Sequence, residues 1–144
     1  MFGINTAKDR LKSLKSNYDK LLEEPLNISL AEQTCSDAWH LTDWVLEENK
    51  KLDSSLTKEK FRKDLYAKCP EFKILHDLVN TFKHKVLSRP KAQIKKTDVH
   101  SGPFSSTFSK EFDVSRLTVH YDNKQIDVDD LVKIAINYWD NLLK

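Results

Sequence analysis

Side chains able to do chemistry gather along residues 69–89, a segment whose apolar residues repeat at helical spacing. Beside the apolar stripe, a polar sector spanning roughly 120° contains His76, Asp77, Asn80, Lys83 and His84. A histidine titrates near neutral pH and can act as a general acid or base. Asn and Asp are poor helix formers in mid-helix, so their presence there needs a reason beyond helix propensity. The sector is therefore a candidate site.

Spacing along this predicted helix restricts which of these side chains can meet. Asn80 and His84 are four residues apart and can touch. Asp77 follows His76 directly, so we do not expect those two side chains to face each other. Two interpretations stay open: a site, or a structural role in which Asn80 caps or crosslinks a neighbouring helix. Asn is a poor zinc ligand and no second helix offers a Cys or His pair, so we predict no metal. We predict no cofactor either.

A second cluster surrounds His40 on an upstream predicted helix. Its neighbours at three and four positions are Asp37, Asp43 and Trp44. A nearby Asp favours the imidazolium or orients one tautomer. The alternative is the polar edge of a packed helix. If the two helices pack together, this cluster and the first one form a polar patch. The patch would hold His40, Asp43, His76 and Asp77, together with Asn80 and His84.

Residues 78–97 contain no Asp or Glu and form a basic window. Its cations are Lys83, Lys85, Arg89, Lys91, Lys95 and Lys96. Phosphate binding depends on local positive charge rather than on a high total. The window is a candidate nucleic-acid-binding edge, and Phe104 and Phe108 beyond it could stack on bases. The alternative is a solvated lysine loop with those Phe side chains in the core.

Composition limits the remaining classes of protein. A chain of 144 residues makes one domain, here predicted as a helical bundle over about 6–88 and a β-hairpin with a closing helix over about 93–144. Only two glycines are present, which excludes a glycine-rich phosphate loop. The N-terminus has no apolar stretch typical of a signal peptide, and we expect a cytoplasmic protein that does not enter a membrane. Cys35 and Cys69 fit free buried thiols, although one disulfide is arithmetically allowed.

Periodicity and capping residues predict the order of the helices and strands. The predicted fold class is mostly α (α+β). Helices are expected over 6–24, over 29–51, from Thr57 to near Cys69, and from Pro70 to just before Pro90. Thr6 with Asp9, and Ser29 with Glu32, resemble capping boxes. The chain looks extended from 93 to 99, and a hairpin turns at 122–124. Phe104, Phe108 and Phe112 are separated by even numbers of residues, so in a strand their side chains would lie on one face. Asp127 or Asp129 is expected to cap the last helix.

Asp77-Leu-Val-Asn80-Thr-Phe-Lys83-His84 resembles the D-x-x-N-x-x-K-H signature of small uncharacterised bacterial helical proteins. Ala38–Trp44 matches the A-x-H-x-x-D-W pattern of their upstream helix, and Tyr138-Trp139 matches the closing segment. More distantly, such proteins are similar to the HEPN domain superfamily, helical bundles found in toxins, RNases and phage-defence systems. The resemblance implies a HEPN-like bundle and a homodimer. His84 matches the catalytic His of that superfamily, but the Arg that precedes it there is absent, since Asp, Leu and Val stand at 77–79.

Three functions follow as expectations. The first is a binding or interaction module of HEPN-like type, linked by resemblance to phage defence or toxin–antitoxin biology, with RNA or a protein as partner. The second is a metal-independent RNase, with His84 as general base and with Asn80 and Lys83 positioning and stabilising phosphate. The third is a structural or antitoxin-like partner subunit. The missing Arg makes the enzyme the less favoured interpretation.

Overall fold

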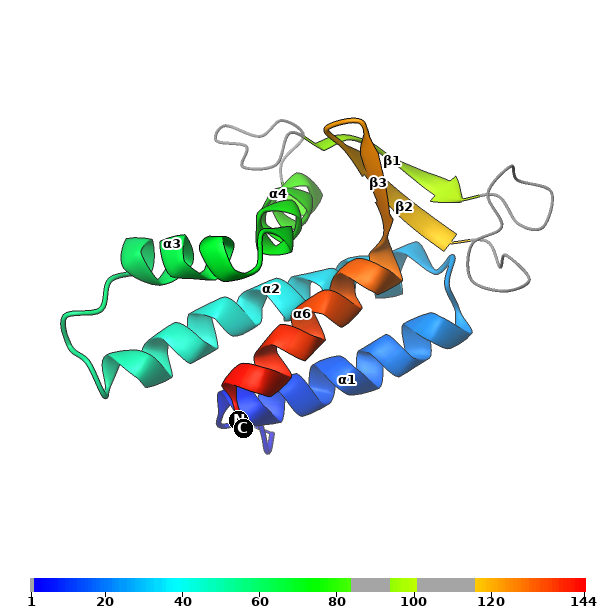
Figure 1. Ribbon diagram of the computed structural model, residues 1–144. Coiled ribbons are helices and arrows are strands. Elements are labelled where there is room, and N and C mark those ends of the chain that lie inside the picture. Colours follow the sequence, from blue (N-terminus) through cyan, green and yellow to red (C-terminus); the bar gives the residue numbers. More distant parts are fainter. Residues whose placement is uncertain (1, 84–93, 101–115) are drawn as a thin grey trace.

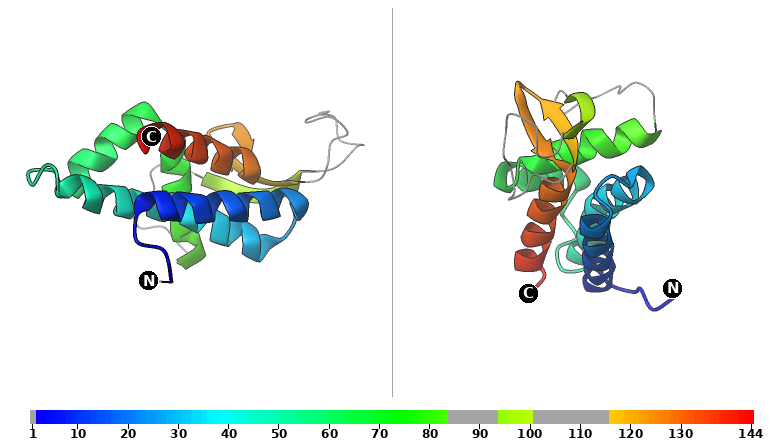
Figure 2. Two further views of the ribbon diagram at one scale, coloured as in Figure 1. Left: turned by 90° about the horizontal axis from the view of Figure 1, so that it is seen from below. Right: turned by 90° about the vertical axis from the view of Figure 1, so that its right-hand side faces the viewer.

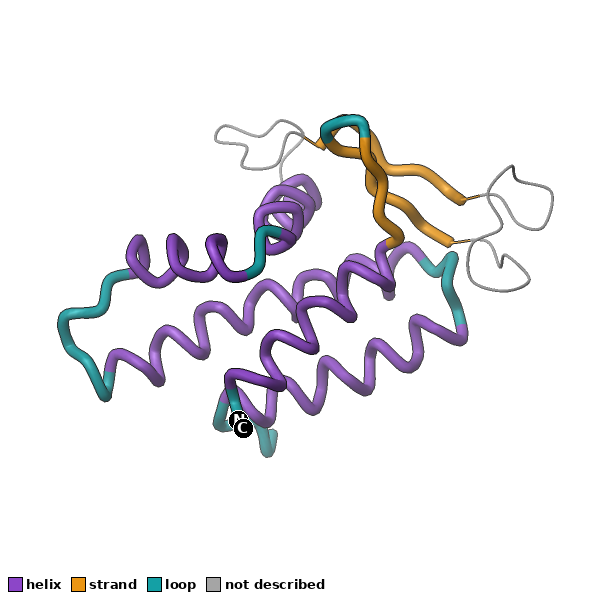
Figure 3. The backbone as a smooth tube through the Cα atoms, viewed as in Figure 1, coloured by secondary structure: helices purple, strands orange, loops and turns teal. Residues whose placement is uncertain are grey.

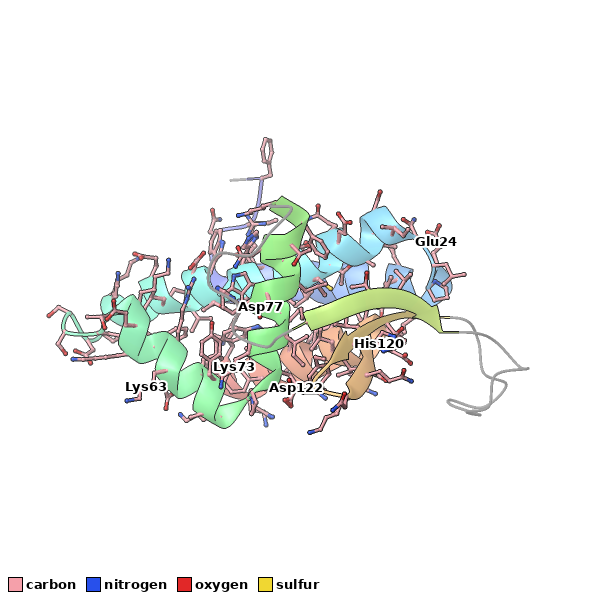
Figure 4. The ribbon with its side chains drawn as sticks, turned by 90° about the horizontal axis from the view of Figure 1, so that it is seen from above. Glu24, Lys63, Lys73, Asp77, His120 and Asp122 are labelled. Carbon is pink, nitrogen blue, oxygen red and sulfur yellow. The ribbon has the colours of Figure 1, made fainter. Side chains whose placement is uncertain are left out.

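The fold, seen in a computed structural model, is described for residues 2–83, 94–100 and 116–144 (Figure 1). It is mostly helical with one small antiparallel sheet. The elements are α1 (Ala7–Glu23), α2 (Ile28–Lys50), α3 (Lys58–Lys68), α4 (Glu71–Lys83), β1 (Ile94–His100), β2 (Arg116–Tyr121), β3 (Lys124–Asp127) and α6 (Val128–Leu142). The two long helices α1 and α2 run side by side, α6 lies along them, and α4 crosses over α2 (Figure 1 and Figure 4).

The predicted start of α1 is confirmed. The Thr6 side chain accepts a hydrogen bond from the Asp9 backbone, and the Asp9 carboxylate accepts from the Thr6 backbone, which completes a capping box. Leu11, Leu14 and Leu21 then repeat at helical spacing and are buried. A second carboxylate, from Glu48 on α2, accepts from the Ala7 backbone at 2.7 Å and ties the two helices together.

For α2 the predicted range holds within a residue or two, but the predicted capping box is wrong. Asn27, not Ser29, is the N-cap, and its side chain accepts from the Leu30 backbone at 3.0 Å. Ser29 is inside the first turn of the helix. Asn27 satisfies an otherwise unpaired N–H of the first turn as well as Ser would.

The third and fourth helices form the upper layer of the bundle as drawn in Figure 3. Thr57 caps α3 as predicted, and this helix buries only Leu65. The backbone turns at Cys69 and Pro70 into α4, whose buried residues are Phe72, Ile74, Leu75, Asp77, Leu78 and Val79. The predicted continuation of this helix to residue 89 lies outside the described residues.

The sheet has three strands in the order β1-β2-β3, all antiparallel. The predicted hairpin is confirmed as β2–β3, and its two turn residues, Asp122 (φ 41°) and Asn123 (φ 60°), have the left-handed backbone that tight hairpin turns require. The segment expected to be extended is β1, which pairs with β2 along its length. The sheet lies at the end of the bundle where α6 begins (Figure 2). Phe104, Phe108 and Phe112 lie outside the described residues.

The last helix completes the core. Asp127 occupies its N-cap position, as one of the two predicted alternatives, although its side chain makes no capping hydrogen bond. Trp139 is fully buried, and its indole N–H donates to the Ala38 carbonyl on α2 at 3.1 Å. Its ring meets Phe72 of α4 edge-on, with 5.1 Å between centroids. One aromatic side chain therefore links α6, α2 and α4.

Candidate functional site

On α4, three polar side chains form a continuous hydrogen-bonded chain. His76 Nδ1 lies 2.7 Å from Asp77 Oδ1, and Asn80 Nδ2 lies 3.1 Å from His76 Nε2. An amide nitrogen can only donate, so Nε2 accepts and the ring proton is assigned to Nδ1, which donates to Asp77. We call His76, Asp77 and Asn80 the α4 triad.

The contact between His76 and Asp77 differs from the sequence-based expectation. Their backbone positions are about 100° apart on the helix, yet the side chains meet. The imidazole ring extends far enough from the backbone for Nδ1 to reach the carboxylate. The sequence suggested that Asn80 would meet His84, whereas the described contact of Asn80 is with His76.

Asp77 is the most unusual member of the triad because it is completely buried, with 0% of its surface exposed. The helical pattern assigned it to the polar sector beside the core. A buried carboxylate is costly unless hydrogen bonds or an ion pair compensate for the lost water. The bond to His76, whose side chain is only 12% exposed, supplies part of that compensation. The triad thus extends from the buried Asp77 in the core to the half-buried His76 and Asn80 near the surface.

Trp39 of α2 packs against the triad, and side chains of α3 pack against Trp39. Trp39 of α2 meets the His76 ring edge-on, with 5.3 Å between centroids. Tyr66 of α3 lies parallel to Trp39, at 6.4 Å, and the Arg62 guanidinium lies 5.0 Å over the Trp39 ring. Lys73 of α4 lies 6.0 Å over the Tyr66 ring. We call Trp39, Tyr66 and Arg62 the aromatic stack.

The phenol of Tyr66 is partly buried. Burial raises the pKa of Tyr66, and the Asp77 carboxylate raises it further, while the Arg62 guanidinium acts in the opposite direction. Its hydroxyl is buried and has no hydrogen-bond partner within the described part of the chain. The phenol therefore stays protonated at physiological pH and can act as a hydrogen-bond donor.

His40 and Asp43 of α2 lie on the side of that helix that faces α1, away from the α4 triad. The predicted polar patch is therefore two separate groups. His40 and Asp43 line a cavity of about 270 Å³ together with Arg10 and Ser13 of α1. The Arg10 guanidinium in this cavity lies 4.7 Å over the Trp44 ring. The division follows from the helix: Trp39 points toward α4, and its neighbour His40, about 100° further round, points toward α1.

The other predicted site residues fall mainly outside the described ranges. Outside them lie His84, Lys85, Arg89 and Lys91. Of the three residues predicted for an RNase site, the structure therefore describes Asn80 and Lys83 but not His84. Lys83 is exposed at the end of α4. Lys95 and Lys96 belong to β1, and the structure describes their backbone but not their side chains.

The two hydrogen bonds and the Trp39 contact hold the His76 ring in place. Both ring nitrogens of His76 are engaged and Trp39 covers its ring, so the imidazole is fixed in one tautomer and one orientation. The sequence placed His76, Asp77 and Asn80 in one polar sector but did not predict the contacts among them, nor that Trp39, Arg62 and Tyr66 lie beside them. A signal was present, since Arg62 and Tyr66 are four residues apart and share one face of α3.

Two further sets of residues bear on metals and thiols. Asp127, Asp129 and Asp130 have carboxylate oxygens within 4.8 Å of one another. They lie at the N-cap and in the first turn of α6, where the helix dipole favours negative charge. Asp129 Oδ1 accepts from the Asp130 backbone at 3.1 Å. Cys35 and Cys69 are both buried free thiols. Burial raises the pKa of Cys69 to about 11.

Among the helices that the structure describes, none has the length and apolar character needed to cross a membrane. Comparison of the chain with protein-family models, with curated proteins and with solved structures gives no match.

Proposed function

We propose that this chain is a small binding module of HEPN-like type and that its ligand is single-stranded RNA, bound on the surface of α3 and α4. The observation that carries the proposal is the segregation of charge. Residues 58–97 hold twelve Lys and Arg against four Asp and Glu, whereas the rest of the chain holds twelve against eighteen. The small total of +2 therefore conceals a strongly basic region and an acidic remainder.

The basic region includes a helix that is free to meet a ligand. On α3 only Leu65 is fully buried, and Lys58, Lys60, Lys63 and Lys68 are exposed. It carries five cations and two carboxylates. Lys63 on α3 and Lys73 on the neighbouring α4 are both exposed (Figure 4). Phosphate groups bind such local positive charge, and they release condensed counterions when they do.

The aromatic stack adds an ordered planar group, the Arg62 guanidinium, to the charged surface. Arg62 is half-buried beside Trp39, which orders its planar guanidinium while leaving it at the edge of the basic surface. An ordered guanidinium can contact a phosphate with two N–H groups or stack on a base. Base stacking and phosphate contact together are typical of single-strand recognition.

The geometry of His76 favours binding over catalysis. A general base needs a nitrogen that can reach the proton it removes, and both nitrogens of this ring are already hydrogen-bonded. The RNase alternative therefore depends on His84. The resemblance of the D-x-x-N-x-x-K-H segment supports a bacterial phage-defence or toxin–antitoxin setting as part of this proposal, and homodimer formation through the bundle stays a prediction.

Charge reversal on the two described helices tests the proposal. We expect the Lys63→Glu, Lys73→Glu protein to bind a short labelled single-stranded RNA about tenfold more weakly than the wild type at low salt. The slope of log Kobs against log salt should become shallower by about 1.4, because two phosphate contacts are lost. Fluorescence anisotropy over a salt series measures both quantities.

The matched control reverses two exposed cations elsewhere, Lys20 on α1 and Lys133 on α6. Its net charge equals that of the test protein, so a difference between them reports position rather than total charge. Equal weakening by both pairs, or binding by the wild type that does not respond to salt, contradicts the proposal. Gel analysis of the same RNA in EDTA detects cleavage, which would favour the RNase instead.

A further inference from the structure

A separate apolar cavity lies between the bundle and the sheet. Its volume is about 320 Å³, at the lower end of the range of about 300–1,000 Å³ that holds small molecules. Four elements supply its apolar wall: α2 with Ile28, α4 with Leu78 and Phe82, β2 with Leu117, and the first residue of α6, Val128. Since the wall comes from elements distant in sequence, the fold itself creates the cavity.

The cavity also has a small number of polar groups. Thr97 and Thr118 of the sheet and Cys35 of α2, a buried thiol, are among its lining residues. Glu32 is the sole charged side chain among the described lining residues, and it is exposed to solvent. Burial, followed by the nearby Glu32 carboxylate, raises the pKa of Cys35 to about 12. The thiol is therefore uncharged, and one carboxylate gives the cavity its only described charge.

Ile28, which lines the cavity, is 62% exposed, and Leu26 just before it is 47% exposed. Large apolar side chains at such exposure are costly when they cluster without a partner. Ile28 extends the apolar lining outward toward solvent, on the same helix that carries Glu32. An occupant with an apolar body and a positively charged end matches both features.

We infer that this cavity binds a small lipophilic amine, with the apolar chain against Leu78, Phe82 and Leu117 and the ammonium group beside Glu32. This site is distinct from the proposed RNA surface, because its charge is opposite to that of the α3–α4 cations and only Leu78 and Phe82 of its wall belong to α4. A ligand with a carboxylate head would meet repulsion from Glu32 instead of attraction.

Three probes with the same chain and different heads test the inference: n-octylamine, n-octanol and n-octanoate, each below its aggregation concentration. We expect octylamine to bind the full-length protein about threefold more tightly than octanol and about tenfold more tightly than octanoate, as a partly exposed ion pair allows. In Glu32→Gln the three affinities should agree within about twofold. Glu47→Gln, the same change on an exposed part of α2, should leave the order intact. Isothermal titration calorimetry gives the affinities.

Location is tested with a variant that fills the cavity. Thr97→Trp places a large ring in it from an exposed strand position, and Gln125→Trp places the same ring on β3, outside the lining. We expect the first to lose octylamine binding and the second to keep it. The two thiols give a further readout: octylamine should slow modification of Cys35 by methyl methanethiosulfonate and leave the rate at Cys69 unchanged.

Several results would overturn the inference. One is octanoate binding as tightly as octylamine to the wild type. Another is octylamine binding that survives in Thr97→Trp while that protein is folded by circular dichroism. A third is equal protection of Cys35 and Cys69, which indicates a general effect on the fold rather than occupation of the cavity.

Discussion

An Asp77→Ala protein is expected to unfold with a free energy about 3 kcal/mol lower than that of the wild type. Asp77 is completely buried, and its carboxylate accepts from His76 at 2.7 Å. Removing it leaves the imidazole N–H without its acceptor and a cavity beside α4. Urea denaturation followed by circular dichroism measures the change.

Two comparisons make this first prediction specific. Asp64→Ala removes a carboxylate from the exposed Lys68 pair on α3 and should cost less than about 1 kcal/mol. In a double-mutant cycle, Asp77→Ala and His76→Ala should be coupled by about 1 kcal/mol or more. If the two effects simply add, the hydrogen bond between them does not stabilise the fold, and the triad has lost its proposed role.

The second large effect is expected at Trp139. Its ring is completely buried and contacts the rings of Phe72 and Tyr138, while its N–H donates to the Ala38 carbonyl. Trp139→Ala should lower the free energy of unfolding by about 4 kcal/mol. Trp139→Phe keeps most of the apolar contact but leaves the Ala38 carbonyl without this donor, so it should cost about half as much.

Trp44 provides the control for this second prediction. It is half-buried on α2 and contacts Arg10 at the surface of the bundle. Thermal and urea unfolding of Trp44→Ala should show a much smaller loss than Trp139→Ala. A loss of similar size would mean that the core is not organised around the contact of α6 with α2 and α4.

Local rules were enough to predict most of the elements. Thr6 with Asp9 and Thr57 determine where two helices begin, because each side chain accepts a bond from a backbone N–H nearby in sequence. Asp122-Asn123 determines the hairpin in the same way, since both residues tolerate a positive φ. At α2 the prediction placed the capping residue at Ser29, whereas Asn27, two residues earlier, is the N-cap.

The site was less predictable because its contacts are tertiary. Helical periodicity assigned Asp77 to a polar face, but it could not show that α2 and α3 cover that face. Nor could it show that Trp39 turns toward His76 while His40 turns toward α1. The role of β1 likewise depends on pairing with a strand distant in sequence. Residue type and spacing identified the triad as unusual, and the packing of three helices decides what it does.

The charge pattern connects the sequence with the proposed function. The sequence marked residues 78–97 as basic, and the fold adds α3, on which Lys58, Lys60, Lys63 and Lys68 are exposed. A basic helix of this kind, next to an ordered Arg62, is where we expect RNA to bind. The acidic remainder of the chain would repel phosphate and so restrict binding to that surface.

Titration of the ¹⁵N-labelled protein with single-stranded RNA at low salt, followed by amide chemical shifts, tests the central claim most directly. The account predicts that the largest shifts occur at the amides of Lys58–Lys68 and Glu71–Lys83, and that they return toward their free values as salt is added. Amide shifts confined to α1 and α6, or a spectrum that RNA does not change at low salt, would contradict it.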